Sequence, residues 1–378
     1  MKIMVSAGEI SGDLHGAYLV NELKKLLPNA YYFGIGSERL AAAGVEIKLD
    51  ITRRSTIGIL ETIPNLLALY RSFRRAKALL IKERPDLVIL IDSQGFNLPL
   101  ANFCRSLGIK TVYYIAPQEW LWGTNKGVAR VLRAVSLVIA IFPAEYKKFR
   151  SFGDNVVYFG HPLLDIVKAS ADQPALRQKF SFTAGQVVAL CPGSRQQELK
   201  SLLPILAETA RLMRQAKPEI NFIVPVSSPR FLNIIEQAFS DLACKFVLND
   251  SYDALASADL AICVSGTVNL EASLLGVPNI MVYKLSRFSY YLGKYILKIE
   301  KKIKYFCMTN IVLDKKVIPE LIMDQANPFL ISKSALTLLA SKADREAMSR
   351  EFSRLKDILG QPGTISQAAK SISEVLSH

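Results

Sequence analysis

The sequence predicts an α/β fold in which helices cover parallel sheets, with two such domains in the chain. Three observations support this prediction. Apolar runs typical of buried parallel strands alternate with amphipathic helical segments, the alternation restarts after a polar stretch near residue 170, and 378 residues are more than one core normally holds. We therefore expect two tandem Rossmann-like domains, with ligands bound in the cleft between them at the carboxyl ends of the strands.

The expected strands recur at regular intervals in both halves. Each is a short apolar run followed by a turn, and apolar residues at helical spacing fill the gaps, as between Leu14 and Leu27. The expected domains cover 1–165 and 166–345, and terminal helices over 346–378 pack back on the N-terminal domain. The expected strands span 2–7, 31–34, 86–92, 111–115, 137–142 and 156–159, then 187–190, 221–226, 244–248, 260–264 and 279–283.

The composition indicates a basic protein with an acidic partner. The formal net charge is +14, and many basic residues concentrate in two windows that are also rich in Leu, Ile, Phe and Tyr. This favours an anionic membrane surface over nucleic acid, for which no recognition motif is present. Single cysteines and the lack of metal-ligand spacing predict no disulfide, no metal and a reducing cytosol. Early acidic residues exclude a signal peptide, and no apolar run is long enough to span a membrane.

A glycine turn, Gly8 to Asp13, follows the first expected strand. It matches neither the dinucleotide fingerprint nor the P-loop, so we expect no cofactor. Gly8 and Gly12 would let backbone and substrate approach closely, with Ser11 beside them. The carboxylates of Glu9 and Asp13 are candidate catalytic groups. An ordinary turn between a strand and a helix is the alternative interpretation.

A second turn, Gly193-Ser194-Arg195, follows the first strand of the second half. Backbone N–H groups at a helix start, together with the fork of donors on Arg195, suit phosphate oxygens. The alternative is structural, because Glu198 could cap the same helix start.

A third turn, Ser265-Gly266-Thr267, follows the apolar run 260–264. It leads into a helix whose free N–H groups and dipole also suit a phosphate. Thr267 is placed to cap this helix, and Glu271 could accept hydrogen bonds from sugar hydroxyls. The alternative is a plain packing unit.

Asp92 ends an otherwise apolar strand at the carboxyl edge of the first expected sheet. A carboxylate there is placed for general-base catalysis, and partial burial would raise its pKa toward a useful range. The alternative is an aspartate that only hydrogen-bonds the turn 93–95.

The window 57–70 has more apolar residues than one core-facing stripe needs, and an arginine cluster follows it. Docking on anionic lipid would use Leu60, Ile63, Leu66 and Leu67. Burial of these residues in the core is the alternative.

Taken together, these motifs resemble the lipid-A-disaccharide synthases, which are glycosyltransferases of the two-domain GT-B type. The resemblance covers nearly the whole chain, and the first and second turns together are specific. The motifs are Ala7 to Asp13, Tyr114 to Trp122, Gly160-His161-Pro162, Pro192 to Arg195, Ser265 to Glu271, and Asn310 within Met308 to Ile311.

The resemblance implies a peripheral enzyme on the cytoplasmic face of the inner membrane, and it is compatible with a homodimer. The enzyme would join UDP-2,3-diacylglucosamine to 2,3-diacylglucosamine 1-phosphate (lipid X) with inversion, forming a β-1,6 disaccharide and UDP. The diphosphate would rest on Gly266 and Thr267, Glu271 would hold the ribose, Arg195 would stabilise the leaving UDP without a metal, and Asn310 matches a donor-site position.

One departure concerns the base. Many members carry a second aspartate where this chain has Gly95. Asp92 is then the expected base, with Glu9, Asp13 and Glu119 as alternatives. The competing interpretations of the whole chain are another UDP-N-acetylglucosamine enzyme of this fold, such as a muropeptide-type transferase or a 2-epimerase, and a basic nucleic-acid-binding protein.

Overall fold

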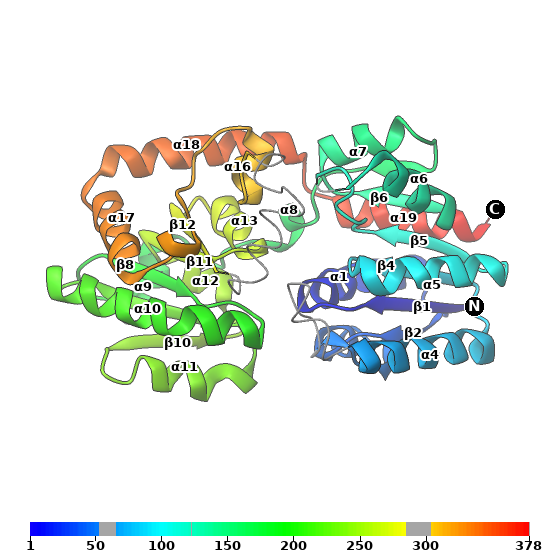
Figure 1. The fold of residues 1–378 in the computed structure, drawn as a ribbon, viewed down its shortest axis with the longest axis horizontal. Helices are drawn as coiled ribbons and strands as arrows, with labels where there is room; N and C mark the ends of the chain where they lie inside the picture. Colours follow the sequence, from blue (N-terminus) through cyan, green and yellow to red (C-terminus); the bar gives the residue numbers. More distant parts are fainter. Residues whose placement is uncertain (53–65, 122, 285–303, 378) are drawn as a thin grey trace. The chain divides into compact units, whose positions relative to one another are not determined.

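The computed structural model describes residues 1–52, 66–121, 123–284 and 304–377, and the chain forms two compact units (Figure 1). Unit 1 comprises Met1–Ile166 and Leu359–His378, and unit 2 comprises Val167–Ile358. Each unit has one parallel sheet covered by helices, which confirms the predicted fold class.

Unit 1 is built on a seven-stranded sheet with the order β3-β2-β1-β4-β5-β6-β7. The edge strand β3 was not expected, because its four residues carry little of the apolar pattern of a buried strand. The elements of unit 1 are β1 Lys2–Ala7, α1 Ile10–Leu26, β2 Tyr31–Ile35, α2 Glu38–Ala42, β3 Glu46–Leu49, α4 Leu66–Glu83, β4 Leu87–Ile91, α5 Gln94–Ser106, β5 Lys110–Tyr114, α6 Asn125–Ala134, β6 Leu137–Ala140, α7 Pro143–Arg150, β7 Val156–Tyr158, α8 Leu163–Ile166 and α19 Thr364–Ser377.

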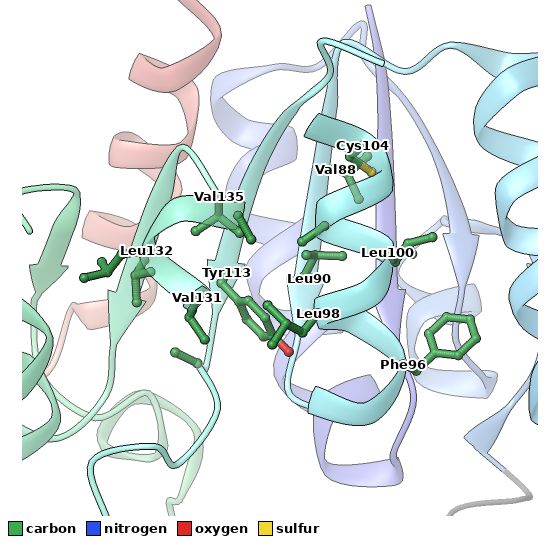
Figure 2. Close-up of a cluster of buried hydrophobic side chains, with 14 of the residues drawn as sticks. Val88, Leu90, Phe96, Leu98, Leu100, Cys104, Tyr113, Val131, Leu132 and Val135 are labelled. Carbon is green, nitrogen blue, oxygen red and sulfur yellow. The ribbon is translucent and has the colours of Figure 1, made fainter. Parts of the chain in front are cut away.

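One face of this sheet packs against α4, α5 and α6. Strand side chains alternate between the two faces, so Val88, Leu90 and Tyr113 share this core. Figure 2 shows these side chains facing those of α5 and α6, including Leu98 and Val131. The core therefore fixes β4, β5 and α5, the elements that flank Asp92.

Helix α1 covers the other face and begins at Ile10 rather than near Leu14, so Gly12 and Asp13 lie in its first turns. A Cβ on Gly12 would lie 3.5 Å from Ile91 Cγ2, which places this glycine against the sheet. Helix packing on β4 therefore draws into α1 a segment that the sequence alone suggested was a turn.

The segment Gly160-His161-Pro162 contacts the chain at Leu359, where the second part of unit 1 begins. The carbonyl of Leu359 accepts hydrogen bonds from the Tyr158 hydroxyl and from the His161 N–H, both at 2.9 Å. Gly160 has φ +115° and Gly360 has φ +106°, and a Cβ on Gly360 would lie 3.1 Å from the Gly160 Cα. Two glycines are needed because the backbones meet here without room for side chains.

The same region starts helix α19. The Asp165 carboxylate accepts hydrogen bonds from the Gly363 N–H (2.5 Å), the Ile365 N–H (2.9 Å) and the Thr364 hydroxyl (3.0 Å). Helix α19 then packs along α1, so the end of the chain from Leu359 packs back on the N-terminal unit, whereas residues 346–358, which were expected to do the same, belong to unit 2.

We expect Gly160→Ala to lower the free energy of unfolding of unit 1 by about 1–3 kcal/mol, because the new Cβ would combine a left-handed φ with a contact 2.7 Å from Thr364 Cγ2. Both tryptophans belong to unit 1, so urea denaturation followed by tryptophan fluorescence measures this. Gly363→Ala is the matched control, since φ is +97° but no atom lies within 4 Å of the added Cβ. Equal losses in both variants would contradict a cost from the contact itself.

Unit 2 is built on a six-stranded sheet with the order β10-β9-β8-β11-β12-β13. Unit 2 extends past residue 345 because α18 contributes Met348 and Phe352 to a core with Met281 of β12. The elements of unit 2 are α9 Gln173–Lys179, β8 Val187–Cys191, α10 Gln196–Ala216, β9 Asn221–Val226, η3 Pro229–Phe231, α11 Leu232–Ala238, β10 Cys244–Leu248, α12 Ser251–Ala256, β11 Leu260–Val264, α13 Thr267–Leu274, β12 Asn279–Tyr283, α16 Met308–Leu313, β13 Glu320–Ile322, η5 Met323–Gln325, α17 Pro328–Ala340 and α18 Lys342–Leu359.

Candidate active site

The sheet of unit 1 has a topological switch point between β1 and β4. These strands are neighbours, yet β2 lies on the far side of β1 and β5 on the far side of β4. The turns after β1 and β4 therefore diverge at one edge, which is where ligands bind in sheets of this kind. A Cβ on Gly8 would lie 2.3 Å from Ser93 Oγ, so the absence of a side chain at Gly8 lets the two turns touch.

Asp92 lies half-buried at this edge, directly after β4. Its backbone is left-handed, with φ +50°, and so is that of Ser93 with φ +51°. In the turn after the neighbouring strand β5, Ile115 has φ +61°. Left-handed backbone is costly for residues with side chains, most of all for β-branched ones, and such strain concentrates at functional sites. The carboxyl edge around Asp92 is therefore a strong candidate for the catalytic centre.

Glu9 and Asp13, the two carboxylates of the first turn, have different environments. Glu9 is half-buried at the N-cap position of α1. Asp13 is buried, and its two oxygens accept hydrogen bonds from the N–H groups of Ser37 (2.6 Å) and Arg39 (3.0 Å) at the start of α2. Burial raises the pKa of Asp13, and these hydrogen bonds oppose the rise. Asp13 is thus committed to holding α2, which makes it a weaker candidate for the base than Asp92 or Glu9.

Ser11 and Gly12, the other residues expected on the first turn, lie in the first turn of α1. Ser11 is half-buried, whereas Gly12 is buried against Ile91. Gly12 therefore permits close packing of α1 on β4, and Ser11 stays the better candidate for a contact with the acceptor.

Glu119, the remaining base candidate, is buried in the segment after β5. It accepts hydrogen bonds from the Gln94 side chain (2.6 Å) and the Thr124 N–H (3.2 Å). A Cβ on Gly127 would lie 2.0 Å from a Glu119 oxygen, so this carboxylate lies against the start of α6. Gly95, by contrast, is exposed, with no atom within 4 Å of the position a Cβ would take. The position that carries an aspartate in the family pattern therefore has open space around it.

Glu145 is a carboxyl group at the same edge of the sheet that sequence analysis missed. It follows β6, is buried, and accepts hydrogen bonds from the N–H groups of Ile141 (2.7 Å) and Phe142 (3.3 Å). Burial raises the pKa of Glu145 to about 8, and the charge of Asp92 adds to the rise. In the sequence Glu145 looks like an ordinary capping residue of α7, because only the tertiary structure creates its burial.

Of the window 57–70, which was expected to face lipid, the structure describes only residues 66–70. Leu60 and Ile63 lie outside the described residues, and Leu66 begins α4. Leu67 is 72% exposed, Tyr70 60% and Ile81 56%, so the core interpretation is wrong for Leu67. The basic residues exposed on α4 are Arg71, Arg74, Arg75 and Lys82.

Unit 2 repeats the switch point between β8 and β11, which are parallel neighbours. The turns after these strands carry the two expected phosphate-binding sites, called phosphate seats below: one at the start of α10 and one at the start of α13. Gly193 has φ +110°, and a Cβ there would lie 3.1 Å from Val264 Cγ2, so the turn after β8 lies beside the end of β11. The structure thus brings the two predicted phosphate seats together at one edge of one sheet.

The start of α10 is occupied by a carboxylate of the chain itself. Glu198 accepts hydrogen bonds from the N–H groups of Ser194 (2.9 Å) and Arg195 (3.2 Å), and it pairs with the Arg195 guanidinium at 2.7 Å. The lack of a side chain at Gly193 makes room for Glu198, since a Cβ would lie 2.4 Å from its Oε2. A phosphate at this seat would have to displace Glu198.

The start of α13 has no such occupant among the described side chains. Gly266 is the N-cap residue, with φ +153°, and as a glycine it has no side chain to cap the helix. Thr267 is the first helical residue, and the N-cap position belongs to Gly266. The expectation that Thr267 caps α13 was therefore wrong, because the capping side chain is that of the N-cap residue. Gly266 and Thr267 are exposed, and Ser265 is held by a hydrogen bond from its N–H to the Val282 carbonyl (3.0 Å). This helix start can therefore receive an anion.

Glu271 and Asn310 occupy different environments in unit 2. Glu271 is half-buried on α13, one turn after the helix start. Asn310 is fully buried: its amide donates to the Ile318 carbonyl and to Glu320, and its oxygen accepts from the N–H groups of Val317 and Ile318, all at 2.9 Å. These four hydrogen bonds use its full capacity. Asn310 therefore holds the segment before β13.

Within residues 1–52, 66–121, 123–284 and 304–377, no group of three or more His, Cys, Asp or Glu side chains could hold a metal ion. Of the helices described in these ranges, none combines the length and the hydropathy needed to cross a bilayer.

The comparisons with known proteins agree on a family and a fold. The family described as lipid-A-disaccharide synthetase matches residues 3–373. The lipid-A-disaccharide synthase of Syntrophus aciditrophicus (strain SB) is 37% identical over 376 residues, which cover 97% of this chain and 96% of that protein. The UDP-GlcNAc 2-epimerase of Neisseria meningitidis, solved with UDP-GlcNAc, is 13% identical with a TM-score of 0.64 and full coverage of both chains. The spinosyn rhamnosyltransferase SpnG is 13% identical with a TM-score of 0.61, covering 98% of this chain and 99% of that one.

The two parallel-sheet units thus define a GT-B protein, a class that includes glycosyltransferases and epimerases. The chain belongs to the lipid-A-disaccharide synthase family and is a glycosyltransferase.

Proposed function

We propose that this protein transfers the sugar of UDP-2,3-diacylglucosamine to the 6-hydroxyl of 2,3-diacylglucosamine 1-phosphate. The hydroxyl oxygen bonds to the anomeric carbon, the bond from that carbon to the diphosphate breaks with inversion, and its electron pair leaves with UDP. The hydroxyl proton passes to a carboxylate. Family membership supports this reaction. The single observation that assigns it to particular residues is the start of α13, where Gly266 and Thr267 are exposed and a glycine holds the N-cap position.

The UDP diphosphate is proposed to bind at Gly266 and Thr267. Of the two helix starts at this edge, that of α10 already has the Glu198 carboxylate on its N–H groups, whereas that of α13 begins at the exposed residues Gly266 and Thr267, with no capping carboxylate among the described side chains. Exposed N–H groups at the positive end of a helix dipole stabilise a phosphate. Two structural neighbours, the Neisseria meningitidis epimerase bound to UDP-GlcNAc and S. aureus MnaA bound to UDP, support a nucleotide site in this fold. Glu271, one turn along α13, would accept hydrogen bonds from the ribose.

Arg195 is proposed to stabilise the charge that develops on the departing UDP. Its side chain is 20% exposed and pairs with Glu198 at the turn after β8, next to the end of β11. A preorganised cation in a partly desolvated position stabilises a developing negative charge more than a mobile one in water. The ion pair with Glu198 would keep the guanidinium in place between turnovers.

Asp92 is proposed as the general base. Its turn lies at the switch point beside Gly8, whereas the Asp13 carboxylate holds the start of α2 through two backbone hydrogen bonds. Glu9 and Glu119 are the alternative carboxylates, and Glu119 already accepts two hydrogen bonds in a buried position.

A product assay tests the reaction. The protein is incubated with UDP-2,3-diacylglucosamine and 2,3-diacylglucosamine 1-phosphate, with and without EDTA, and the disaccharide is detected by mass spectrometry. We expect disaccharide 1-phosphate and UDP in equal amounts under both conditions. Turnover of UDP-N-acetylglucosamine, with no disaccharide from the diacyl donor, would contradict the proposal.

The lipid substrates require contact with a membrane, and we propose that α4 supplies it as a peripheral contact on the cytoplasmic face of the inner membrane. Leu67, Tyr70, Arg74 and Ile81 recur at helical spacing on the exposed side of α4, opposite the buried Ala76. An apolar face flanked by arginines is typical of helices that lie on anionic lipid.

We expect the double variant Leu67→Ser/Tyr70→Ser to lose most of its binding to vesicles containing anionic lipid, with the melting temperature within about 2 °C of wild type because both side chains are exposed. Vesicle co-sedimentation measures the binding. Leu107→Ser, an exposed leucine outside α4, is the matched control and should bind normally. Unchanged binding by the double variant would place the membrane contact elsewhere.

A further inference from the structure

Both backbone polar atoms of Asp92 are tied to other parts of unit 1. Its N–H donates to the Ile115 carbonyl at 3.1 Å. Its carbonyl accepts hydrogen bonds from the Tyr113 hydroxyl and from the Asn97 side-chain amide, each at 2.9 Å. Three segments therefore converge on one residue: the end of β5, the turn after it, and helix α5.

Asn97 makes this arrangement through a fully buried side chain. Its amide nitrogen also donates to the carbonyls of Ile91 (3.0 Å) and Ser6 (3.2 Å), and its oxygen accepts from the Ser6 hydroxyl (2.7 Å). The three surrounding carbonyls share the two hydrogens of the nitrogen, and the hydroxyl suits the oxygen, so the amide has one orientation. Asn97 thus joins the ends of β1 and β4, the two strands at the switch point, to the carbonyl of Asp92.

Tyr113 reaches the same carbonyl from the core. Its ring packs between the sheet and the helices α5 and α6 and is fully buried, as Figure 2 shows. The ring therefore needs no hydrogen bond to stay in place, and its hydroxyl makes a directed contact with Asp92.

The turn that these groups hold is strained. Asp92 and Ser93 are consecutive residues with side chains, and both have left-handed φ values. This conformation costs about 1–2 kcal/mol per residue and occurs mostly at single positions. Backbone in sparsely populated regions persists only where the surroundings over-determine it. Relaxation of the Asp92 φ toward negative values would swing its Cα–Cβ bond and move the carboxylate.

We propose that Asn97 and Tyr113 are positioning residues for the reaction: they hold the Asp92 backbone in its left-handed conformation and so aim the carboxylate at the acceptor hydroxyl. The inference rests on the proposed role of Asp92 as general base. It adds to that role two buried residues that contact neither substrate.

The principal test is Tyr113→Phe, which removes one hydrogen bond to the Asp92 carbonyl and keeps the ring in the core. We expect kcat for disaccharide formation to fall about tenfold while KM for both substrates stays within about twofold, because small misplacement of a catalytic group slows chemistry without weakening binding. Asn97→Ala should reduce kcat by about 100-fold. A melting curve shows whether the Asn97 variant folds; if it does not, the Tyr113 result decides.

Tyr114→Phe is the matched control. Tyr114 is the next residue on β5, is equally buried, and its hydroxyl has no hydrogen-bond partner among the described residues. Because Tyr114 does not touch Asp92 in the described contacts, kcat should equal that of wild type. An equal loss in both phenylalanine variants would overturn the inference, since it would indicate a general effect on the core.

The double variant Asp92→Asn/Tyr113→Phe separates positioning from stability. If Tyr113 acts through the Asp92 carboxylate, the double variant should retain the same residual kcat as Asp92→Asn alone. A further tenfold loss would overturn the inference and leave Asp92 as the base. A nearly wild-type kcat for Asp92→Asn would instead refute the base assignment and this inference with it, while disaccharide formed by the wild-type protein would still support the proposed reaction.

Discussion

Asp92→Asn should lower kcat for disaccharide formation by about 10²–10⁴-fold, the usual contribution of a general base. Asparagine keeps the size of the side chain and the backbone contacts with Tyr113 and Ile115, but it cannot take the proton of the acceptor hydroxyl. KM for the UDP-sugar should change little, because the proposed donor contacts lie in unit 2. Steady-state kinetics with both substrates varied measure the two effects separately.

Two matched variants make this result specific. Glu9→Gln and Glu119→Gln remove the alternative carboxylates at the same edge of the sheet, and each should cost far less activity than Asp92→Asn. Glu119→Gln should also lower the melting temperature, since Glu119 holds Gln94 and the Thr124 N–H. If Glu9→Gln abolishes activity while Asp92→Asn does not, Glu9 is the base.

Arg195→Ala should lower kcat by about 10²–10³-fold, the range seen when one group that stabilises transition-state charge is removed. The guanidinium is held by Glu198 at 2.7 Å, so it is present before charge develops on the leaving UDP. The melting temperature should change little, because Glu198 still accepts hydrogen bonds from the N–H groups of residues 194 and 195. Single-turnover kinetics isolate the chemical step from the release of UDP.

Arg211→Ala is the control on the same helix. Arg211 pairs with Asp241 and Glu208 away from the start of α10, so its loss should leave kcat unchanged. Arg195→Lys keeps the charge but loses the planar fork of donors, and we expect it to recover only part of the rate. Full activity in Arg195→Ala would remove this residue from the mechanism and leave the start of α13 as the proposed anion seat.

Much of the fold could be predicted from the sequence, because buried parallel strands such as β4 and β11 are nearly uninterrupted apolar runs. The two strands that were missed, β3 and β13, lie at sheet edges and are short and partly exposed. An edge strand forms because it pairs with the neighbouring strand, and its sequence need not show the apolar pattern of a buried strand. The start of α1 was missed for a related reason: the packing of Gly12 against Ile91 is a long-range contact.

Part of the candidate site could likewise be predicted from the sequence. The motifs placed Asp92, Arg195 and Gly266 at the ends of strands, since glycine turns and polar residues after apolar runs are local signals. The pairing of Glu198 with Arg195 was also open to local reasoning, because Arg195 is the N-cap residue of α10 and Glu198 follows three positions later.

The sequence by itself determined the fold class, the family resemblance and the positions of the two turns that are proposed to bind phosphate, because each depends on neighbours along the chain. Only the tertiary structure decided which helix start is open, that Asp13 is committed to α2, and that Asn97 and Tyr113 meet at Asp92. Burial raised the pKa of Glu145, a residue that looks ordinary in the sequence. The physical reason is common to all of these: hydrogen bonds and desolvation depend on groups that lie far apart in the chain and come together only when the sheets form.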